Sequence, residues 1–321
     1  MSSLRFDYEE TEFAGLPVQM WDEDEGHGEA PEDPSAVAWQ LKIDEFEEAD
    51  PETFEDTFET MLALTGPAGP TALLIGQWGG AGFEIPPPVD LLIRNADRLT
   101  ALRSLFIGAL TTEDAEVSWI QLCDLTPVLK AFPALERLWV RGGPGLELSP
   151  VRHEALRELV LQSAGLPQEV VHAVGACDLP NLESLELWPG IYERQPTGHI
   201  SPADFAPILQ GRSLPALTRL GLCNTDMTDE LAAALASAPV VARLKGLNLQ
   251  MGVLGDQGAA ALLAGQSLTH LEWLTIDHHY LSAEMEQRLI DALPGVVVNA
   301  ERREWSDDDK EQDIRWPGIV E

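Results

Sequence analysis

Three adjacent residues, Asp277, His278 and His279, are the first candidates for chemistry in this sequence, because all three side chains can ligate a metal ion. They directly follow a short apolar run that ends at Ile276. Adjacent residues at the end of a strand point in different directions, whereas a metal site needs three or four converging donors. We therefore predict no metal site here. An enzyme or enzyme subunit that uses these residues at a loop rim is the alternative.

Other catalytic signatures are missing from the sequence. Cys123, Cys177 and Cys223 are odd in number, lie far apart and form no CxxC pair, so we expect reduced thiols. No GxSxG, P-loop or HExxH pattern occurs, and the Gly-rich stretch at 79–88 lacks the Lys of a phosphate loop. We predict no catalytic residues, no cofactor and a noncatalytic function.

The charge of the chain is strongly negative and unevenly distributed. The formal net charge is −34, from 20 Lys and Arg against 54 Asp and Glu. Residues 1–60 hold 20 of the acidic residues against only Arg5 and Lys42, a net of −18. Because nucleic acids are bound by neutralising phosphates, we expect no nucleic-acid ligand. Solubility is one interpretation of this charge, and attraction to a basic protein partner is the other.

The elements that must position any site repeat along the chain. The pattern LxxLxL, with Ile or Val allowed, begins at Leu102, Leu135, Leu156, Leu182, Leu217, Leu244 and Leu271. The spacings are 33, 21, 26, 35, 27 and 27 residues. Weaker copies begin at Pro70 and Leu293. A repeat at such a period is typical of a solenoid.

Helix signals follow several of these runs. We predict helices in the segments that begin at Leu125, Leu166, Ser201, Thr228, Gly255 and Ser282. Thr228 is expected to cap its helix, and Gly265 to end the helix that follows Gly255. Each unit is then a strand, a turn and a helix, and stacked units place a parallel sheet inside a bend and helices outside.

The stretches LNLQMGVLGDQGAAALL and LGLCNTDMTDELAAALA resemble leucine-rich repeats of ribonuclease-inhibitor type over residues 70–299. The resemblance implies an α/β fold: a leucine-rich-repeat solenoid, or horseshoe, with a concave parallel β-sheet, convex helices and an N-terminal α/β cap. The whole chain, with SWIQLCDLTPVL and LELWPG, also resembles an uncharacterised bacterial leucine-rich-repeat family. That resemblance implies an accessory role in a bacterial modification pathway.

The segments outside the repeats are expected to act as caps. We assign residues 1–69 to an acidic N-terminal cap, with a strand in 37–43, a helix from Asp50 and a mobile loop at about 22–35. The solenoid takes residues 70–299, and residues 300–321 form a C-terminal capping tail. With no signal sequence and no apolar run long enough to span a membrane, we predict a cytoplasmic protein that binds no membrane.

The repeat register places aromatic and Arg side chains on the concave strand surface, because alternate residues of a strand face opposite sides. Such residues dominate the binding energy of protein interfaces. We predict partner binding by Phe106, Arg137, Trp139, Arg141, Trp188, Arg219 and Trp273. If that surface is free, Trp139→Ala with Arg141→Ala should leave the thermal melt almost unchanged.

Two alternatives remain open at this stage. In the first, the acidic N-terminal segment or the C-terminal tail folds onto this surface and pairs its Arg side chains with internal carboxylates. In the second, binding occurs at the rim where the chain leaves the strands, in the loops at 76–83, 118–121, 141–145, 188–192 and 277–280. Either way, the predicted function is a scaffold that holds a protein or peptide, with an inhibitor or holder of a basic protein as the alternative.

Overall fold

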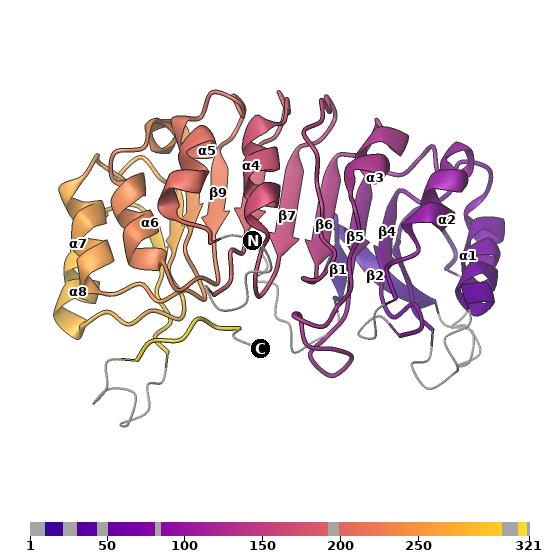
Figure 1. Ribbon diagram of the computed structural model, residues 1–321, viewed down its shortest axis with the longest axis horizontal. Coiled ribbons are helices and arrows are strands. Elements are labelled where there is room, and N and C mark those ends of the chain that lie inside the picture. Colours follow the sequence, from indigo (N-terminus) through magenta and orange to yellow (C-terminus); the bar gives the residue numbers. More distant parts are fainter. Residues whose placement is uncertain are drawn as a thin grey trace. The chain divides into compact units, whose positions relative to one another are not determined.

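The computed structural model describes residues 10–21, 31–43, 51–80, 85–191, 199–303 and 314–319. The chain forms two compact units, Met1–Val160 and Leu161–Glu321. In each unit a largely or wholly parallel sheet carries helices on one face (Figure 1). The prediction of an α/β fold with a parallel sheet is confirmed at this level. The expected mobile loop falls mostly outside the described residues.

The sheet of the first unit follows the chain order. Its strands are β1 (Glu12–Phe13), β2 (Leu16–Trp21), β3 (Ala38–Leu41), β4 (Ala72–Ile75), β5 (Ser104–Ile107) and β6 (Arg137–Arg141). β1 pairs with β2 in an antiparallel hairpin, and β2 to β6 pair with their neighbours in parallel. Strand β7 (Glu158–Gln162) contains the boundary between the two units.

Helices cover one face of this sheet. They are α1 (Pro51–Thr65), α2 (Val89–Arg94), the 3-10 turn η1 (Ala96–Arg98) and α3 (Thr126–Ala131). Leu73, Leu105 and Leu138 stand in register on β4, β5 and β6 and are fully buried. These leucines form one row because each repeat supplies one inward residue at the same strand position, so the pattern that defines the repeat also builds the core.

The second unit has the same construction. Its strands are β8 (Ser184–Leu187), β9 (Arg219–Leu222), β10 (Gly246–Asn248), β11 (Trp273–Thr275) and β12 (Val297–Asn299). They are parallel, and Leu185, Leu220, Leu247 and Leu274 form a continuous buried row across β8 to β11. Strands β4 to β12 each coincide with one of the apolar runs predicted from the sequence, with β6, β7 and β12 ending one residue beyond their runs, which confirms those strands.

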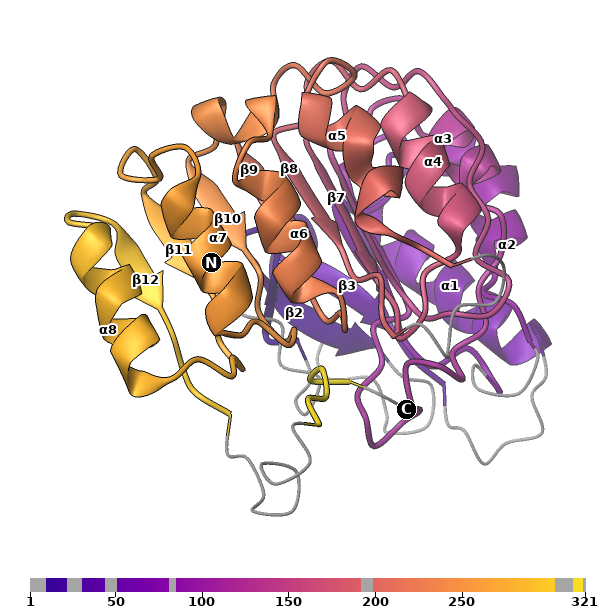
Figure 2. The same cartoon turned by 60° about the vertical axis from the view of Figure 1, so that its left-hand side comes forward.

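The helices of the second unit follow their strands. They are α4 (Gln168–Ala176), η3 (Pro202–Phe205), α5 (Ala206–Gln210), α6 (Thr228–Leu235), η4 (Pro239–Arg243), α7 (Asp256–Ala264) and α8 (Ala283–Ala292). Figure 2 shows α6, α7 and α8 side by side along the same face of the sheet. The predicted helices are confirmed.

The helix ends agree with the sequence in some cases and not in others. The Ser282 hydroxyl caps α8 by accepting the Met285 amide hydrogen at 3.2 Å, and Gly265 follows the last residue of α7. The prediction that Thr228 caps α6 is wrong. Thr228 is the first residue of that helix, and its buried hydroxyl donates to the Thr225 carbonyl and accepts from the Val253 amide of the next repeat.

The hairpin of β1 and β2 was not predicted. Its turn residues, Ala14 and Gly15, both have positive φ, at 58° and 78°. Two consecutive residues of this kind give the turn geometry that suits the twist of a two-residue hairpin. Within the described ranges, no helix combines the length and the apolar character that crossing a membrane would require.

Candidate binding surfaces

The predicted site residues lie on the sheet surface opposite the helices, which we call the strand face. In the first unit, Leu74, Phe106 and Trp139 are in register at the centre of this face on β4, β5 and β6. Arg137 and Arg141 flank Trp139 on β6. The structure therefore brings together Phe106, Arg137, Trp139 and Arg141, as the strand periodicity predicts.

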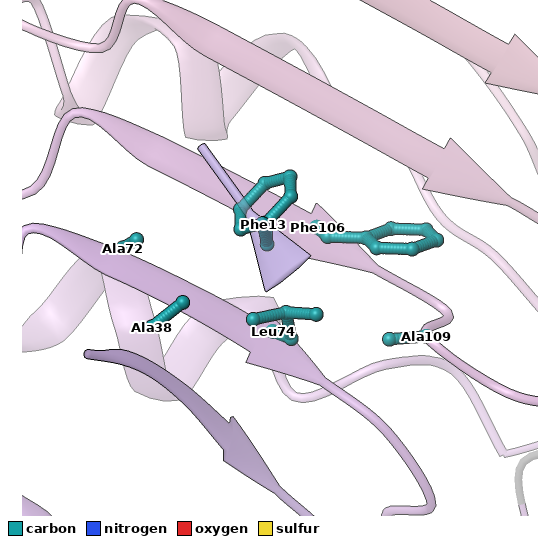
Figure 3. Packing of buried hydrophobic residues seen from close by; sticks show 6 residues of the cluster. All are labelled: Phe13, Ala38, Ala72, Leu74, Phe106 and Ala109. Carbon is teal, nitrogen blue, oxygen red and sulfur yellow. The ribbon is translucent and has the colours of Figure 1, made fainter. Parts of the chain in front are cut away.

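The β1–β2 hairpin covers this part of the strand face. Phe13 packs with Phe106 at 6.0 Å and with Trp139 at 5.0 Å between ring centroids, the second pair edge to face. Figure 3 shows Phe13 of β1 over β4 and β5, with Leu74 and Phe106 beneath it. Edge-to-face aromatic contacts contribute beyond the burial of their area. The hairpin is thus part of the core of this unit, and Phe106 is completely buried.

Arg141 is held inside this cluster with only 2% of its surface exposed. Its guanidinium lies 3.5 Å from the Glu10 carboxylate and 5.1 Å from the centre of the Phe106 ring, and it donates to the Leu110 carbonyl. Burial lowers the pKa of Arg141 to about 10, and the nearby Glu10 partly opposes this shift. Burial likewise raises the pKa of Glu10, an effect that Arg141 reduces. Arg141 is therefore charged at neutral pH.

Glu158 joins the two remaining residues of this group. The Arg137 Nε donates to one carboxylate oxygen of Glu158 at 3.1 Å, and the Trp139 Nε1 donates to the other at 2.8 Å. Arg137 also donates to the Ser104 hydroxyl at 3.1 Å. Both side chains are partly exposed, but their polar groups are already paired within the chain.

The arrangement in the first unit corresponds to the alternative in which the N-terminal segment covers the strand face. Arg141 is buried and Trp139 packs against Phe13. These contacts reverse the expectation that replacing both residues would leave the thermal melt almost unchanged. Replacing Trp139 and Arg141 together by Ala would open a cavity and leave the half-buried Glu10 without its cation, so the melt should fall markedly.

The strand face of the second unit is more polar. Trp188 is completely buried, and its Nε1 donates to the Glu186 carboxylate at 2.8 Å. The other oxygen of that carboxylate accepts the Asn248 amide at 3.1 Å. A Cβ at Gly221 would lie 2.8 Å from the Glu186 Cγ, so this glycine gives the Glu186 side chain room to cross the strand face. Trp188 and Glu186 thus have structural roles.

Arg219 and Trp273 differ from the other predicted residues. They occupy the same position of their strands and lie on either side of Gly246. The Trp273 ring lies so close to Gly246 that any side chain there would collide with it. Both Arg219 and Trp273 are partly exposed. Among the described residues, the Arg219 side chain forms no hydrogen bond and no ion pair.

The Asp277, His278 and His279 side chains turn toward different partners. Asp277 accepts the Glu301 amide at 2.6 Å, the His278 Nδ1 lies 3.2 Å from the Gly252 carbonyl, and the buried His279 lies 3.3 Å from the Ala300 carbonyl. Burial lowers the pKa of both histidines, and Arg303 lowers that of His278 further. In the part of the chain that the structure describes, no group of three or more His, Cys, Asp or Glu is placed to hold a metal ion.

The three cysteines are free thiols. Burial raises the pKa of Cys123 to about 11, and burial with the neighbouring Glu186 raises the pKa of Cys223. A thiol acts as a nucleophile only as the thiolate. Both groups are therefore protonated and unreactive at neutral pH.

The loop rim divides into buried and exposed parts. Trp78 is buried and donates to the Ile85 carbonyl at 3.0 Å, so it fills space under its loop. Trp119 is 52% exposed. Residues 81–83 and Tyr192 of the predicted rim lie outside the described residues.

Sequence reasoning missed Glu10 and Phe13, which make the buried contacts to Arg141 and Trp139. A usable signal was present, because Ala14-Gly15 is followed by the alternating residues Leu16, Val18 and Met20. The sequence assigned residues 300–321 to a capping tail but did not identify Asn224, Tyr280 and Arg303 as the residues that bind its described part.

Comparison with known proteins shows a similarity to solved structures. No protein-family model matches the chain, and no curated protein matches it. Among solved structures, the chain is similar to a Bacteroides fragilis protein determined by the Northeast Structural Genomics Consortium, with a TM-score of 0.74 and 26% sequence identity. The match covers 85% of this chain and 76% of that protein. The similarity concerns the arrangement of the chain, and the description of that protein gives no activity.

Proposed function

We propose that this protein is a noncatalytic interaction module that holds a protein or peptide on the strand face of its second unit. The observation that carries the proposal is the state of Arg219 and Trp273. They are partly exposed side chains of the types that anchor interfaces, and the Arg219 guanidinium has no partner among the described residues. The Trp273 indole lies directly over Gly246, which carries no side chain to displace it.

The finer fold is part of the proposal. We propose a leucine-rich-repeat solenoid of ribonuclease-inhibitor type with a concave strand face. The LxxLxL positions of the strands, the helix after most strands and the rows of buried leucines support it. We further propose a cytoplasmic location and, from the resemblance to the uncharacterised bacterial family, an accessory role in a modification pathway.

The geometry indicates which groups a partner would present. Arg219 would pair with a carboxylate or a backbone carbonyl, and Trp273 would take an apolar or aromatic side chain. The Glu186 carboxylate is already used by Trp188 and Asn248, so it would fix the floor of the site rather than bind the partner.

Affinity capture from the native cell tests the proposal with a matched set of variants. The wild-type chain, Arg219→Ala with Trp273→Ala, and Arg288→Ala are used in parallel. Arg288 is exposed on α8, so its replacement removes the same charge away from the strand face. We expect one partner to be recovered with wild type and Arg288→Ala and lost with the double variant. Equal recovery with all three proteins would exclude this surface.

The net charge favours a second candidate, a holder or inhibitor of a basic protein. A charge of −34 would steer a cationic partner toward the molecule and would make association faster at low ionic strength. Stopped-flow association with the recovered partner at low and physiological salt tests this. An association rate that does not change with salt would rule out steering.

A further inference from the structure

The described C-terminal residues, 314–319, occupy the ends of the strands in the second unit. We call them the C-terminal segment. In this subsection, the rim means the residues of the second unit that directly follow β9, β10 and β11. Both views show this segment, in yellow, passing beneath the strand ends (Figures 1 and 2). The Gly318 amide donates to the Met251 carbonyl at 2.7 Å, which places the segment directly after β10.

Asn224 holds the last described residue of this segment by its backbone. The Asn224 amide group donates to the Ile319 carbonyl at 3.2 Å, and its side-chain oxygen accepts the Ile319 amide at 2.8 Å. Asn224 is fully buried and has a positive φ of 45°, a conformation that Asn adopts more readily than most residues. Without the segment, both of these polar groups would lose their partner.

Tyr280 and Arg303 hold the middle of the segment in the same way. The Tyr280 hydroxyl donates to the Trp316 carbonyl at 2.7 Å and accepts the Trp316 amide at 2.9 Å. The Arg303 guanidinium donates to the carbonyls of Trp316 and Pro317 at 2.9 and 3.3 Å. Its contact with the His278 Nε2, at 2.9 Å, fixes the guanidinium against the rim.

Side chains of the segment also contact the rim. The Arg315 guanidinium lies 3.6 Å from the Asp229 carboxylate and packs closely on Gly255. A Cβ at Gly318 would lie 2.7 Å from the Cε and 3.0 Å from the Cβ of Met251, so a larger residue would displace the Met251 side chain. Pro317 and Ile319 are buried, whereas Trp316 is 42% exposed.

We propose that the rim of the second unit is a peptide-binding site, that the C-terminal segment is its resident ligand, and that an extended segment of a partner protein exchanges with it. The partner segment carries a basic residue, then an Xaa-Pro-Gly sequence and a buried aliphatic residue. The proposal concerns the rim and does not depend on the function proposed for the strand face.

The chemistry of the contacts supports exchange by a peptide. Asn224, Tyr280, Arg303 and the Met251 carbonyl all bind backbone groups, which every extended peptide possesses. Backbone pairing provides affinity, and the narrow places at Gly318 and Ile319 provide selectivity. The resident segment is covalently attached, so its high effective concentration opposes a free peptide of equal intrinsic affinity.

A fluorescent peptide with the sequence of residues 314–321 tests the proposal on full-length protein. The chain with Gly318→Ala carries a weakened resident segment and an intact rim. We expect this variant to bind the peptide at least about tenfold more tightly than wild type does, because the competitor is impaired. A peptide with the Gly replaced by Ala should bind at least about tenfold less tightly than the native peptide.

Asn224→Asp provides the control for the site itself. Asp has the size of Asn and keeps the oxygen that accepts the Ile319 amide hydrogen. It lacks the N–H group that donates to the Ile319 carbonyl, so two acceptors would face each other in a buried place. In the chain that carries Gly318→Ala, adding Asn224→Asp should reduce peptide affinity at least about tenfold. No binding to the Gly318→Ala chain, or equal binding of a scrambled peptide, would overturn the proposal.

Hydrogen exchange gives a second readout that does not depend on the variants. Excess peptide should raise the exchange rate of the wild-type Gly318 and Ile319 amides, because it displaces the resident segment. The buried amide of Leu247 on β10 should exchange at an unchanged rate, which distinguishes displacement from unfolding. Unchanged exchange at Gly318 and Ile319 with saturating peptide would contradict exchange at the rim.

Discussion

The strand faces of the two units are built on the same repeat but are packed differently. In the first unit, Phe106 and Arg141 lie beneath the chain's own hairpin, where Phe13 and Glu10 contact them. In the second unit, Arg219 and Trp273 are partly exposed, and the described C-terminal segment binds the rim instead. The strand positions determine which residues face this surface. A segment distant in sequence determines whether they are available.

The largest expected effect comes from removing the hairpin's aromatic contact. Phe13→Ala should lower the free energy of unfolding of the first unit by about 3 to 5 kcal/mol, as for other buried Phe side chains. Urea unfolding followed by far-UV circular dichroism measures the change. A loss of less than about 1 kcal/mol would mean that the hairpin adds little to this core.

The buried ion pair gives a comparable effect that a double variant should reverse. Arg141→Ala should cost about 3 kcal/mol, because the half-buried Glu10 carboxylate loses its cation. Arg141→Met combined with Glu10→Gln should recover most of that loss, since apolar or neutral replacements of a buried pair are often tolerated. Equal destabilisation by the two proteins would show that the pair does not account for the effect.

Acid should weaken the binding of the C-terminal segment but not that of the β1–β2 hairpin. The folded state depresses the pKa of His278, so below pH 6.5 the unfolded chain binds a proton that the folded chain does not, and stability decreases. Arg303, His279 and the Gly252 carbonyl face this imidazole. Protonation would set His278 against Arg303 and weaken the hold on the C-terminal segment.

The raised pKa of Glu10 has the reverse consequence for the hairpin. The folded state takes up a proton before the unfolded state does, so acidification through this range does not weaken the hairpin. Hydrogen exchange, corrected for its intrinsic pH dependence, should show increased opening at Gly318 from pH 7 to 5.5 and none at the Val18 amide of the hairpin. His278→Asn should remove the effect at Gly318, and an effect unaltered by this variant would argue against His278.

The smallest expected effect on the free energy of unfolding comes from replacing the partly exposed residues Arg219 and Trp273. Arg219→Ala with Trp273→Ala should change the free energy of unfolding by no more than about 1 kcal/mol, because neither side chain is buried. Chemical denaturation beside the Phe13→Ala protein gives the direct comparison. A loss as large as that of Phe13→Ala would place Arg219 and Trp273 in a core.

The sequence determined the repeated elements well, because a local pattern controls them. The LxxLxL spacing placed β4 to β12, and Leu247 and its counterparts form the buried rows that this spacing requires. The helix of residues 51–65 and the strand of residues 38–41 were also correctly predicted. Thr228 failed as a cap because its hydroxyl binds the adjacent repeat, a contact between residues that are 25 apart in the chain.

The sites were less predictable because they depend on pairing between distant segments. Arg141 and Glu10 are separated by 131 positions, and Asn224 and Ile319 by 95. Periodicity identifies the face on which Arg141 lies, yet it contains no information on which terminal segment packs there. Trp139 and Trp273 both lie on the strand face of their unit, and only the structure shows that the Trp139 indole packs against Phe13.

The central claim is that Arg219 and Trp273 on the strand face of the second unit are accessible, whereas the hairpin covers Phe106 and Arg141 in the first unit. Hydroxyl-radical footprinting of the full-length protein, read by mass spectrometry, measures both faces in one sample. We predict that Trp273 is oxidised several times faster than Phe106 and Trp188, which are completely buried. Protection of Trp273 equal to that of Phe106 would contradict the account.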